Sequence, residues 1–471
     1  MSTPSTAVLR TERVPIELWL QIIRFADCEQ RDLANLTLVS KFLAWVVQPL
    51  LFADFTVTLL RAHLDGQVTK CQHTAYHTRM LERLQFLKSE RIAHNVKSIS
   101  ICLHPKAMHL DPEVLVGADE IVNEVFSVLA YLPHLKAFHG HEVHLTSPRI
   151  EQLVAVQYLE GLHFNACSAT IDVILPNSQL RHLSLYGEMG GPKFGWWIPL
   201  LRSPSLTHLS YNSTSIARKN VKDPNEALFP AIAIGPVIKS LQFLRLPCAS
   251  PRFPCFEMAL SKCSSVQELL MDSWDEGHVG LPIHGQAAQV PLPSNILPQL
   301  RAINAPYMFI SRCLQDRPIS HITVSLDIPW NALRDFETIR TRCPQLEELV
   351  LTMNHVPLTR VLSFALSFSR LRGLRLEILN ASLETTHKPL FGLVKDTSLP
   401  RGLKSLRIYS RMISMNYSAP TSLKDVTNKK KHLIRAVRRK CPKIVDIHLS
   451  TADELIAWQR PYTTREMVGM E

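Results

Sequence analysis

Two short stretches of this chain contain residues that could do chemistry, one rich in histidine and one rich in glycine. The first, HGHEVH, places His139 and His141 on one face of an expected strand, with His144 close behind. Zinc needs three or four such ligands, and no second cluster with ligand spacing supplies the rest, so a polar strand end is the favoured interpretation. The second, LSLYGEMGGPKFG, is not a phosphate-binding loop, because a proline precedes its Lys193 and a phenylalanine follows it.

Other catalytic patterns are missing from the sequence. It contains no HExxH metalloprotease motif and no GxSxG nucleophile elbow. Its ten cysteines include no CxxC pair, which favours reduced, mostly buried thiols over a zinc site or a disulfide framework. We therefore expect a protein that is not an enzyme and that uses no cofactor or metal. A hydrolase whose serine, histidine and aspartate converge only in space stays an open alternative.

The chain is basic, with a formal net charge of +11, and its densest cationic run is NKKKHLIRAVRRKCPK (428–443). The run resembles a bipartite nuclear address and could equally contact phosphates. The favoured interpretation is the solvated outer helix of a repeat, with Leu433, Ile434 and Val437 turned inward. No regular aromatic interleaving supports base stacking, so nucleic acid is not an expected partner.

No segment of the sequence combines the length and hydropathy of a membrane span. The opening MSTPSTAVLRTERV is polar, and the most apolar later run, ALFPAIAIGPVI, is broken by two prolines. With apolar residues at 46% and charged residues at 20%, the composition is that of an ordinary globular chain. We expect a protein of the cytoplasm and/or nucleus that has no membrane partner.

One short pattern returns along most of the chain: an apolar residue, two variable residues, then apolar, variable, apolar. Clear copies begin at Leu180, Leu206, Leu241, Val266, Leu346, Leu371, Leu403 and Ile444. Weaker copies begin at Val96, Leu135, Leu159, Leu300 and Ile319. The alternating end of the pattern predicts a short strand with one buried face, and several copies follow an amphipathic stretch that stops at a proline. One unit is therefore a helix, a turn and a strand, and stacked units share a core.

This unit resembles a leucine-rich repeat, whose pattern L-x-x-L-x-L-x-x-N/C-x-L is matched in its first six positions. LHFNAC (162–167) comes nearest to the polar turn that completes the pattern. Intervals between copies run from about 19 to about 41 residues, against about 20–29 in the family, so inserted loops or unseen copies are expected. A doubly wound α/β domain is the alternative, but it favours longer Val/Ile strands and a Gly-rich nucleotide turn. The expected fold class is an α/β repeat solenoid, an irregular leucine-rich-repeat horseshoe, preceded by a small all-α helical module.

The helical module is indicated by VPIELWLQII near the N-terminus. Pro15 suits the first helical position, and Leu18 and Ile22 share one helix face. A second helix, LANLTLVSKFLAWVV, is expected after a cap at Asp32, with Pro49 ending it or forcing a new turn. About 40 residues then form two or three helices with more apolar surface than they can hide from one another, which argues for a partner.

The stretch VPIELWLQIIRFADCEQRDLANLTLVSKFLAWVVQPLLF resembles an F-box, the helical module that docks on the Skp adaptor of SCF (Skp–cullin–F-box) ubiquitin ligases. Val14–Pro15 stands for the family's Leu-Pro, Asp32–Leu33 for its Asp-Leu, and Leu38–Lys41 for its Leu-Val-Cys/Ser-Lys signature. Leu50–Phe52 closes the box. Phe42–Leu43 replaces a common Arg-Trp and departs from the family pattern in the third-helix contacts.

The resemblance implies a substrate receptor. Its F-box would anchor the chain to the Skp adaptor, and through it to the cullin/RING ligase core, while the solenoid binds an unidentified protein target. For the adaptor we expect apolar residues of the helices: Pro15, Leu18, Ile22, Leu33, Leu36, Val39, Leu50 and Leu51. For the target we expect solvent-facing basic and histidine side chains beside or within strands: Arg181, His182, His208, Arg245, Arg372 and Arg375. An adaptor-bound scaffold acting outside a ligase and a nuclear, nucleic-acid-associated repeat protein stay open.

The expected boundaries follow from these assignments. They are a disordered N-terminus at 1–11, the F-box at 12–55, a connecting loop and helix at 56–92, the solenoid at 93–460 and a C-terminal tail at 461–471.

Overall fold

The computed structural model of the chain forms two compact units, residues 1–206 with 213–224 and residues 207–212 with 225–471. The residues that it describes are 15–26, 28–59, 70–103, 118–170, 179–187, 195–212, 225–247, 250–252, 254–272, 290–328, 336–354, 367–379, 399–411, 423–450 and 455–460. The expected disordered N-terminus and C-terminal tail lie outside these residues, and so does Val14 of the F-box pattern.

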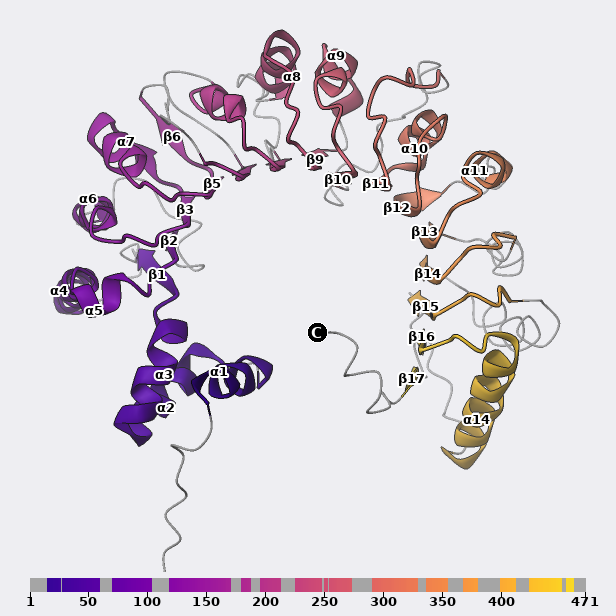
Figure 1. Cartoon of the computed structure of the whole chain (residues 1–471), viewed down its shortest axis with the longest axis horizontal. Coiled ribbons are helices and arrows are strands. Elements are labelled where there is room, and N and C mark those ends of the chain that lie inside the picture. Colours follow the sequence, from indigo (N-terminus) through magenta and orange to yellow (C-terminus); the bar gives the residue numbers. More distant parts are fainter. Residues whose placement is uncertain are drawn as a thin grey trace, which may run out of the picture. The chain divides into compact units, whose positions relative to one another are not determined.

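The first unit begins with helices and continues as a parallel sheet. Its helices are α1 (Ile16–Phe25), α2 (Gln30–Val39), α3 (Lys41–Leu51), α4 (Lys70–Leu87), α5 (Glu90–Ala93), α6 (Ala118–Leu129) and α7 (Ser147–Val154), with the 3-10 turn η4 (Ile198–Arg202). Its sheet runs in the order β1 (Asp54–Leu59), β2 (Ser98–Leu103), β3 (Ala137–His141), β5 (Gly161–Asn165) and β7 (His182–Tyr186). Strands β4 (His144–Leu145) and β6 (Ser168–Ala169) form a separate pair. Helices α4, α6 and α7 lie along one face of the sheet, and no described helix covers the other face (Figure 1).

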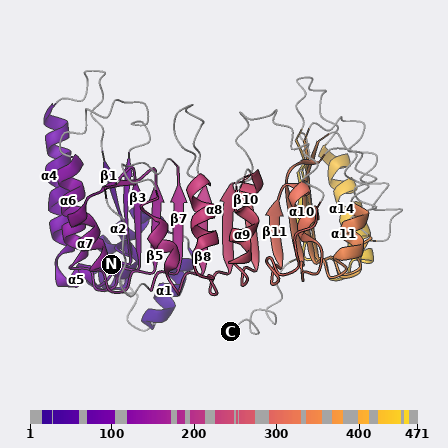
Figure 2. The ribbon, with the colours of Figure 1, turned by 90° about the horizontal axis from the view of Figure 1, so that it is seen from above.

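The second unit repeats this arrangement. Its parallel strands are β8 (His208–Asn212), β9 (Phe243–Pro247), β10 (Glu268–Asp272), β11 (Ala302–Ala305), β12 (His321–Ile328), β13 (Glu348–Asn354), β14 (Gly373–Leu379), β15 (Ser405–Arg411) and β16 (Asp446–Ser450), and β17 (Leu455–Gln459) ends the sheet antiparallel to β16. Its helices are α8 (Asn225–Ile234), α9 (Phe256–Ser261), α10 (Tyr307–Cys313), α11 (Phe336–Arg342) and α14 (Leu423–Lys440), with the 3-10 turn η5 (Ser250–Arg252). Helices α8, α9 and α10 run alongside the strands on one face of the sheet (Figure 2).

The repeated sequence pattern sets where each strand begins. In every clear copy and every weaker copy, the strand starts two residues after the first apolar residue of the pattern, as β7 starts two residues after Leu180. The three apolar positions of that copy, Leu180, Leu183 and Leu185, are fully buried because they face the helix layer. The expected α/β repeat solenoid is therefore confirmed.

Successive strands pair in phase, so that equivalent positions of the pattern lie side by side. Ala137 lies beside Gly161, and Gly161 lies beside His182. The turn before each strand repeats one hydrogen-bond arrangement, as where Lys97 O accepts from the N–H groups of Lys136 (2.7 Å) and Ala137 (3.1 Å). The variable positions inside the strands, the third and fifth of the pattern, therefore form rows across the sheet face that carries no described helix.

The expected polar turn at LHFNAC forms at the end of β5. Cys167 is fully buried there, and its thiol donates to Gly140 O over 3.3 Å. Among the described residues, no helix is long and apolar enough to cross a membrane.

The sheet starts earlier than the expected boundary at residue 93. Strand β1 pairs with β2 from Asp54 beside Ser98 to Leu59 beside Leu103, inside the segment assigned to the F-box end and the connector. The expected connecting helix, α4, packs beside α6 as the outer helix of this first repeat, and Lys88 pairs with Glu124 over 2.8 Å. The local sequence explains the difference, because Phe52, Phe55 and Val57 complete the repeat pattern where the F-box ends.

The expected second helix of the module is divided at Ser40. This residue is extended (φ −159°, ψ 157°), and its Oγ accepts from the Leu43 N–H over 3.1 Å, so that it ends α2 and caps α3. Helix α2 begins after Glu29, whose N–H donates to the Asp32 carboxylate over 3.2 Å. Asp32 therefore lies inside the helix that it was expected to cap, and Pro49 lies inside α3.

Candidate functional site

Helices α1 to α3 form a small module around its own core. The fully or almost fully buried side chains are Ile23, Leu33, Val46 and Val47. Partly buried side chains from all three helices pack against them, among them Trp19, Leu20, Leu36, Phe42, Leu50 and Leu51. Such a core holds the three helices together and leaves other apolar residues of the same helices for contact with solvent or a partner.

Five large apolar side chains of this module are exposed, and we call them the module's apolar surface. They are Leu18 (48%), Ile22 (53%), Leu38 (84%), Val39 (69%) and Trp45 (58%). Leu18 and Ile22 share one face of α1, since residues four apart in a helix are neighbours. Trp45 is a large ring of the kind that contributes most to protein interfaces. The arrangement suits burial of apolar area against another protein.

The eight residues expected to contact an adaptor divide into two groups. The exposed group is Pro15, Leu18, Ile22 and Val39. The group inside or against the core is Leu33, Leu36, Leu50 and Leu51. Sequence reasoning missed Trp45 because it assumed one continuous helix, which fixes the wrong phase beyond Ser40. It missed Leu38 because that residue lies off the expected apolar face of the helix. The capping residue Ser40 was the signal that could have found the division.

The module is joined to the first repeat without a flexible linker. Ala53, directly after the module, accepts the N–H groups of Lys97 (2.8 Å) and Ser98 (2.9 Å) through its carbonyl oxygen. Arg91 Nε donates to Gln48 Oε1 over 3.0 Å, and the Phe52 and Phe86 rings lie 6.0 Å apart. These contacts set the module's orientation relative to the strands of the first unit.

The strand face of the first unit carries a cluster of histidines. His139 and His163 stack face to face with ring centroids 4.2 Å apart and planes within 4°. Burial, with the neighbouring His139 and His182, lowers the pKa of His163 to about 4, and burial also lowers the pKa of His139. The expected target residue His182 lies on this face in β7, and exposed Arg181 precedes that strand. The stacked pair is therefore neutral at pH 7.

The strand face of the second unit carries ion pairs. Arg245 binds the Asp272 carboxylate through Nε, with distances of 2.8 and 2.9 Å to the two oxygens. Directly before β14, Arg372 pairs over 3.0 Å with Glu347, which directly precedes β13. The His208 ring stacks on Phe243 at 5.7 Å. The expected basic residues of this unit are thus held in place by neighbours in the sheet.

Further along the same face, Arg375 pairs with Glu377 and lies over the Tyr409 ring at 5.1 Å. Arg407 lies beside Arg375 in the paired strands and donates to Asp446 over 2.6 Å. Sequence reasoning missed Arg407 and Tyr409. Their equivalent positions in the repeat, the fifth and seventh, were the signal that could have found them. The face presents fixed charges and hydrogen-bonding groups of both signs.

The histidines of HGHEVH take part in separate local contacts. His139 stacks on His163, and His144 Nδ1 lies 2.8 Å from Ser168 Oγ. Among the residues that the structure describes, no group of three or more His, Cys, Asp or Glu side chains is placed to hold a metal ion. The glycine-rich loop lies mostly outside the described residues, which resume at Gly195.

The chain matches no protein-family model and none of the curated proteins. It is similar to the crystal structure of an internalin from Listeria monocytogenes, with a TM-score of 0.29 and 12% identity over 77% of this chain and 86% of that one. It is also similar to a leucine-rich-repeat protein of Leptospira interrogans, with a TM-score of 0.28 and 14% identity over 79% of this chain and 97% of that one.

The class of protein is defined by the chain's own coordinates. In each unit, short strands pair in parallel and in phase, each strand begins at a fixed place in a leucine-based pattern, and helices cover one face. This is an α/β repeat solenoid of the leucine-rich type, a fold that presents an extended surface for binding other proteins.

Proposed function

We propose that this chain is the substrate-recognition subunit of an SCF-type ubiquitin ligase. In this proposal, the α1–α3 module binds the Skp adaptor and the strand face binds a protein target. The observation that supports it is the concentration of exposed apolar side chains in the module. Five of the thirteen exposed large apolar residues among the described part of the chain lie in these three short helices, although the module has its own buried core.

The attachment of the module to the first repeat gives the proposed function a physical basis. A target held on the strand face of the first unit would stay at a set position relative to the adaptor and the ligase core. Tethering raises the effective concentration of the target's lysines at the ubiquitin-loaded partner enzyme. The chain itself then needs no catalytic group, cofactor or metal, since its partners carry out the chemistry.

The strand face is the proposed binding surface for the target. Rows of equivalent positions place Arg245, Arg375 and Arg407 at the fifth position of their repeats. Because each guanidinium is held in one orientation by a carboxylate, little side-chain freedom is lost when a partner binds beside it. We infer a target segment rich in carbonyl and carboxylate acceptors.

The test is direct binding between the purified full chain and a purified Skp adaptor, measured by calorimetry. The variant Leu18→Ala/Ile22→Ala removes two side chains of the module's apolar surface. Since interface anchors contribute about 1–3 kcal/mol each, we expect binding to weaken by about 100-fold. The matched control, Ile234→Ala/Met258→Ala, removes similarly exposed apolar side chains from the second unit and should bind as the parent does.

The outcomes separate the proposed roles. Absence of measurable adaptor binding by the parent chain, or equal weakening in the control, rejects the adaptor-binding role. Far-UV circular dichroism on both variants establishes that the helices are intact. If the adaptor complex fails to retain added cullin, the chain is a scaffold that acts outside a ligase, and retention supports the ligase subunit.

A further inference from the structure

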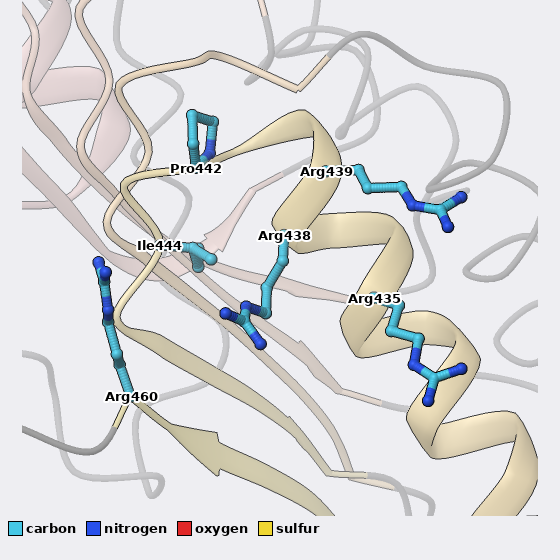
Figure 3. A pocket seen from close by; sticks show the side chains of 6 residues that line it. All are labelled: Arg435, Arg438, Arg439, Pro442, Ile444 and Arg460. Atoms are coloured by element: carbon cyan, nitrogen blue, oxygen red, sulfur yellow. The ribbon is translucent and has the colours of Figure 1, made fainter.

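A basic pocket lies at the C-terminal end of the second unit, away from its strand face. It has a volume of about 350 Å³ and is lined by Arg435, Arg438, Arg439, Pro442, Ile444 and Arg460. Figure 3 shows Arg438 reaching from α14 toward Ile444, with Arg460 on the other side of Ile444. Arg435 and Arg439 extend outward from the same helix (Figure 3). Arg438 and Arg460 therefore flank an apolar floor, and Arg435 and Arg439 line the outer rim of the pocket.

Two separate elements supply these cations. Arg438 belongs to the last turn of α14 and lies over the Trp458 ring of β17 at 5.2 Å. Arg460 directly follows β17, and its N–H donates to Val445 O over 2.8 Å, which continues the antiparallel pairing. The tertiary structure thus brings together arginines that are separated by a turn and two strands.

A purely structural role accounts for part of this cluster. Cations in the last turn of a helix stabilise the negative end of its dipole, which explains Arg438 and Arg439. It does not explain Arg435, one turn earlier, or Arg460, which comes from another element. Among the described residues, the lining contains no acidic side chain. Two cations beside the floor and two at the rim repel one another, and a multivalent anion would remove that repulsion.

We propose that this pocket binds a small molecule that carries two or more phosphoryl groups. A planar guanidinium pairs with two phosphate oxygens at once, and several such forks suit adjacent phosphoryl groups better than a single carboxylate. The pocket volume is in the range of small-ligand sites, and Ile444 and Pro442 offer apolar contact to the organic part of the ligand. Single-stranded nucleic acid fits less well, because the neighbouring Trp458 ring is already covered by Arg438.

Calorimetry on the full chain at 0.15 M salt, with pyrophosphate as the probe and inorganic phosphate for comparison, tests this site. We expect pyrophosphate to bind at least 10-fold more tightly than phosphate. The variant Arg438→Gln/Arg460→Gln should weaken pyrophosphate binding by at least 10-fold. The charge-matched control, Arg370→Gln/Arg401→Gln, removes two exposed arginines elsewhere in the same unit and should leave it unchanged.

A second variant controls for the possibility that the first variant misfolds. Arg435→Gln/Arg439→Gln leaves the contact between Arg438 and Trp458 in place, and it should also weaken pyrophosphate binding. Binding of the chain to vesicles that carry a bisphosphorylated inositol lipid would identify a lipid headgroup as the source of the phosphoryl groups. Binding to pyrophosphate without binding to these vesicles would identify a soluble ligand. The proposal is overturned if pyrophosphate does not bind, or if the control variant loses as much affinity as the pocket variants. It is also overturned if a single-stranded oligonucleotide binds more tightly than pyrophosphate through the same arginines. None of these outcomes depends on adaptor binding.

Discussion

The stacked histidines on the strand face of the first unit make its stability depend on pH. Burial and neighbouring histidines lower the pKa of His163 to about 4 in the folded chain, whereas an unfolded histidine titrates at about 6.5. Between these values the unfolded chain binds the proton and the folded chain does not. The contribution of His163 to stability is therefore lost as the pH falls from about 6.5 to about 4 and changes little below that.

The size of the effect follows from the two pKa values. Lowering the pH from 7.5 to 5 costs about 2 kcal/mol for a site with pKa values of about 4 and 6.5. Water screens the partly buried His163, so we expect about 1 kcal/mol. The variant His163→Gln keeps a polar side chain at this position and removes the titration.

Urea unfolding at pH 7.5 and pH 5, followed by tryptophan fluorescence, measures this difference. Trp196 and Trp197 are buried in the same unit as His163 and report its unfolding. We expect His163→Gln to lose about 1 kcal/mol less stability than the parent on acidification. The control, His134→Gln, changes an exposed histidine of the same unit and should follow the parent. Equal losses in the parent and His163→Gln would refute the reasoning.

Three further predictions concern the caps, the buried arginine and the thiols. Ser40→Ala removes the Oγ that accepts from Leu43 N–H and should destabilise the module by about 1 kcal/mol, measured by thermal unfolding followed by circular dichroism. The control Ser40→Asp keeps a capping side chain and should not destabilise it, and an unchanged stability of Ser40→Ala would contradict the capping role. Arg317, 3% exposed, donates to five backbone carbonyls, so Arg317→Met should lower the free energy of unfolding by about 3 kcal/mol or more. The loss of these bonds should also open the segment 290–297 to protease, and an unchanged cleavage pattern would argue against this role. Burial raises the pKa of the Cys263 and Cys313 thiols to about 12. At pH 8, iodoacetamide should therefore label exposed Cys255 at least 100-fold faster than either buried thiol in the native protein, as measured by mass spectrometry. Comparable labelling of the three thiols would contradict the burial.

Much of the solenoid could be predicted from the sequence because its signal is local. The leucine pattern predicts a strand from alternation alone, and each strand then begins two residues after the first apolar position, as at Leu180 and Leu371. The same pattern at Phe52, Phe55 and Val57 was hidden because these residues also complete the F-box pattern. An overlap of two local signals therefore placed the start of the sheet too late.

The candidate sites were less accessible to sequence reasoning. Apolar spacing cannot separate Leu33, which is in the core of the module, from Leu18, which is exposed, because both lie at helical spacing. Their separation depends on how three helices pack, and that packing depends on the break at Ser40. Likewise, nothing local links Arg438 with Arg460, since the pairing of β16 with β17 brings them to one pocket.

The sequence by itself determined the repeat unit, its strand positions and the surplus of apolar residues near the N-terminus. These properties follow from side-chain alternation and spacing within a few residues of each other. Only the tertiary structure decided which apolar residues are left exposed, which strand-face arginines are paired with carboxylates and which arginines share a pocket. Those outcomes arise from contacts between elements that are distant in the chain, where burial and charge are set by neighbours that local spacing does not specify.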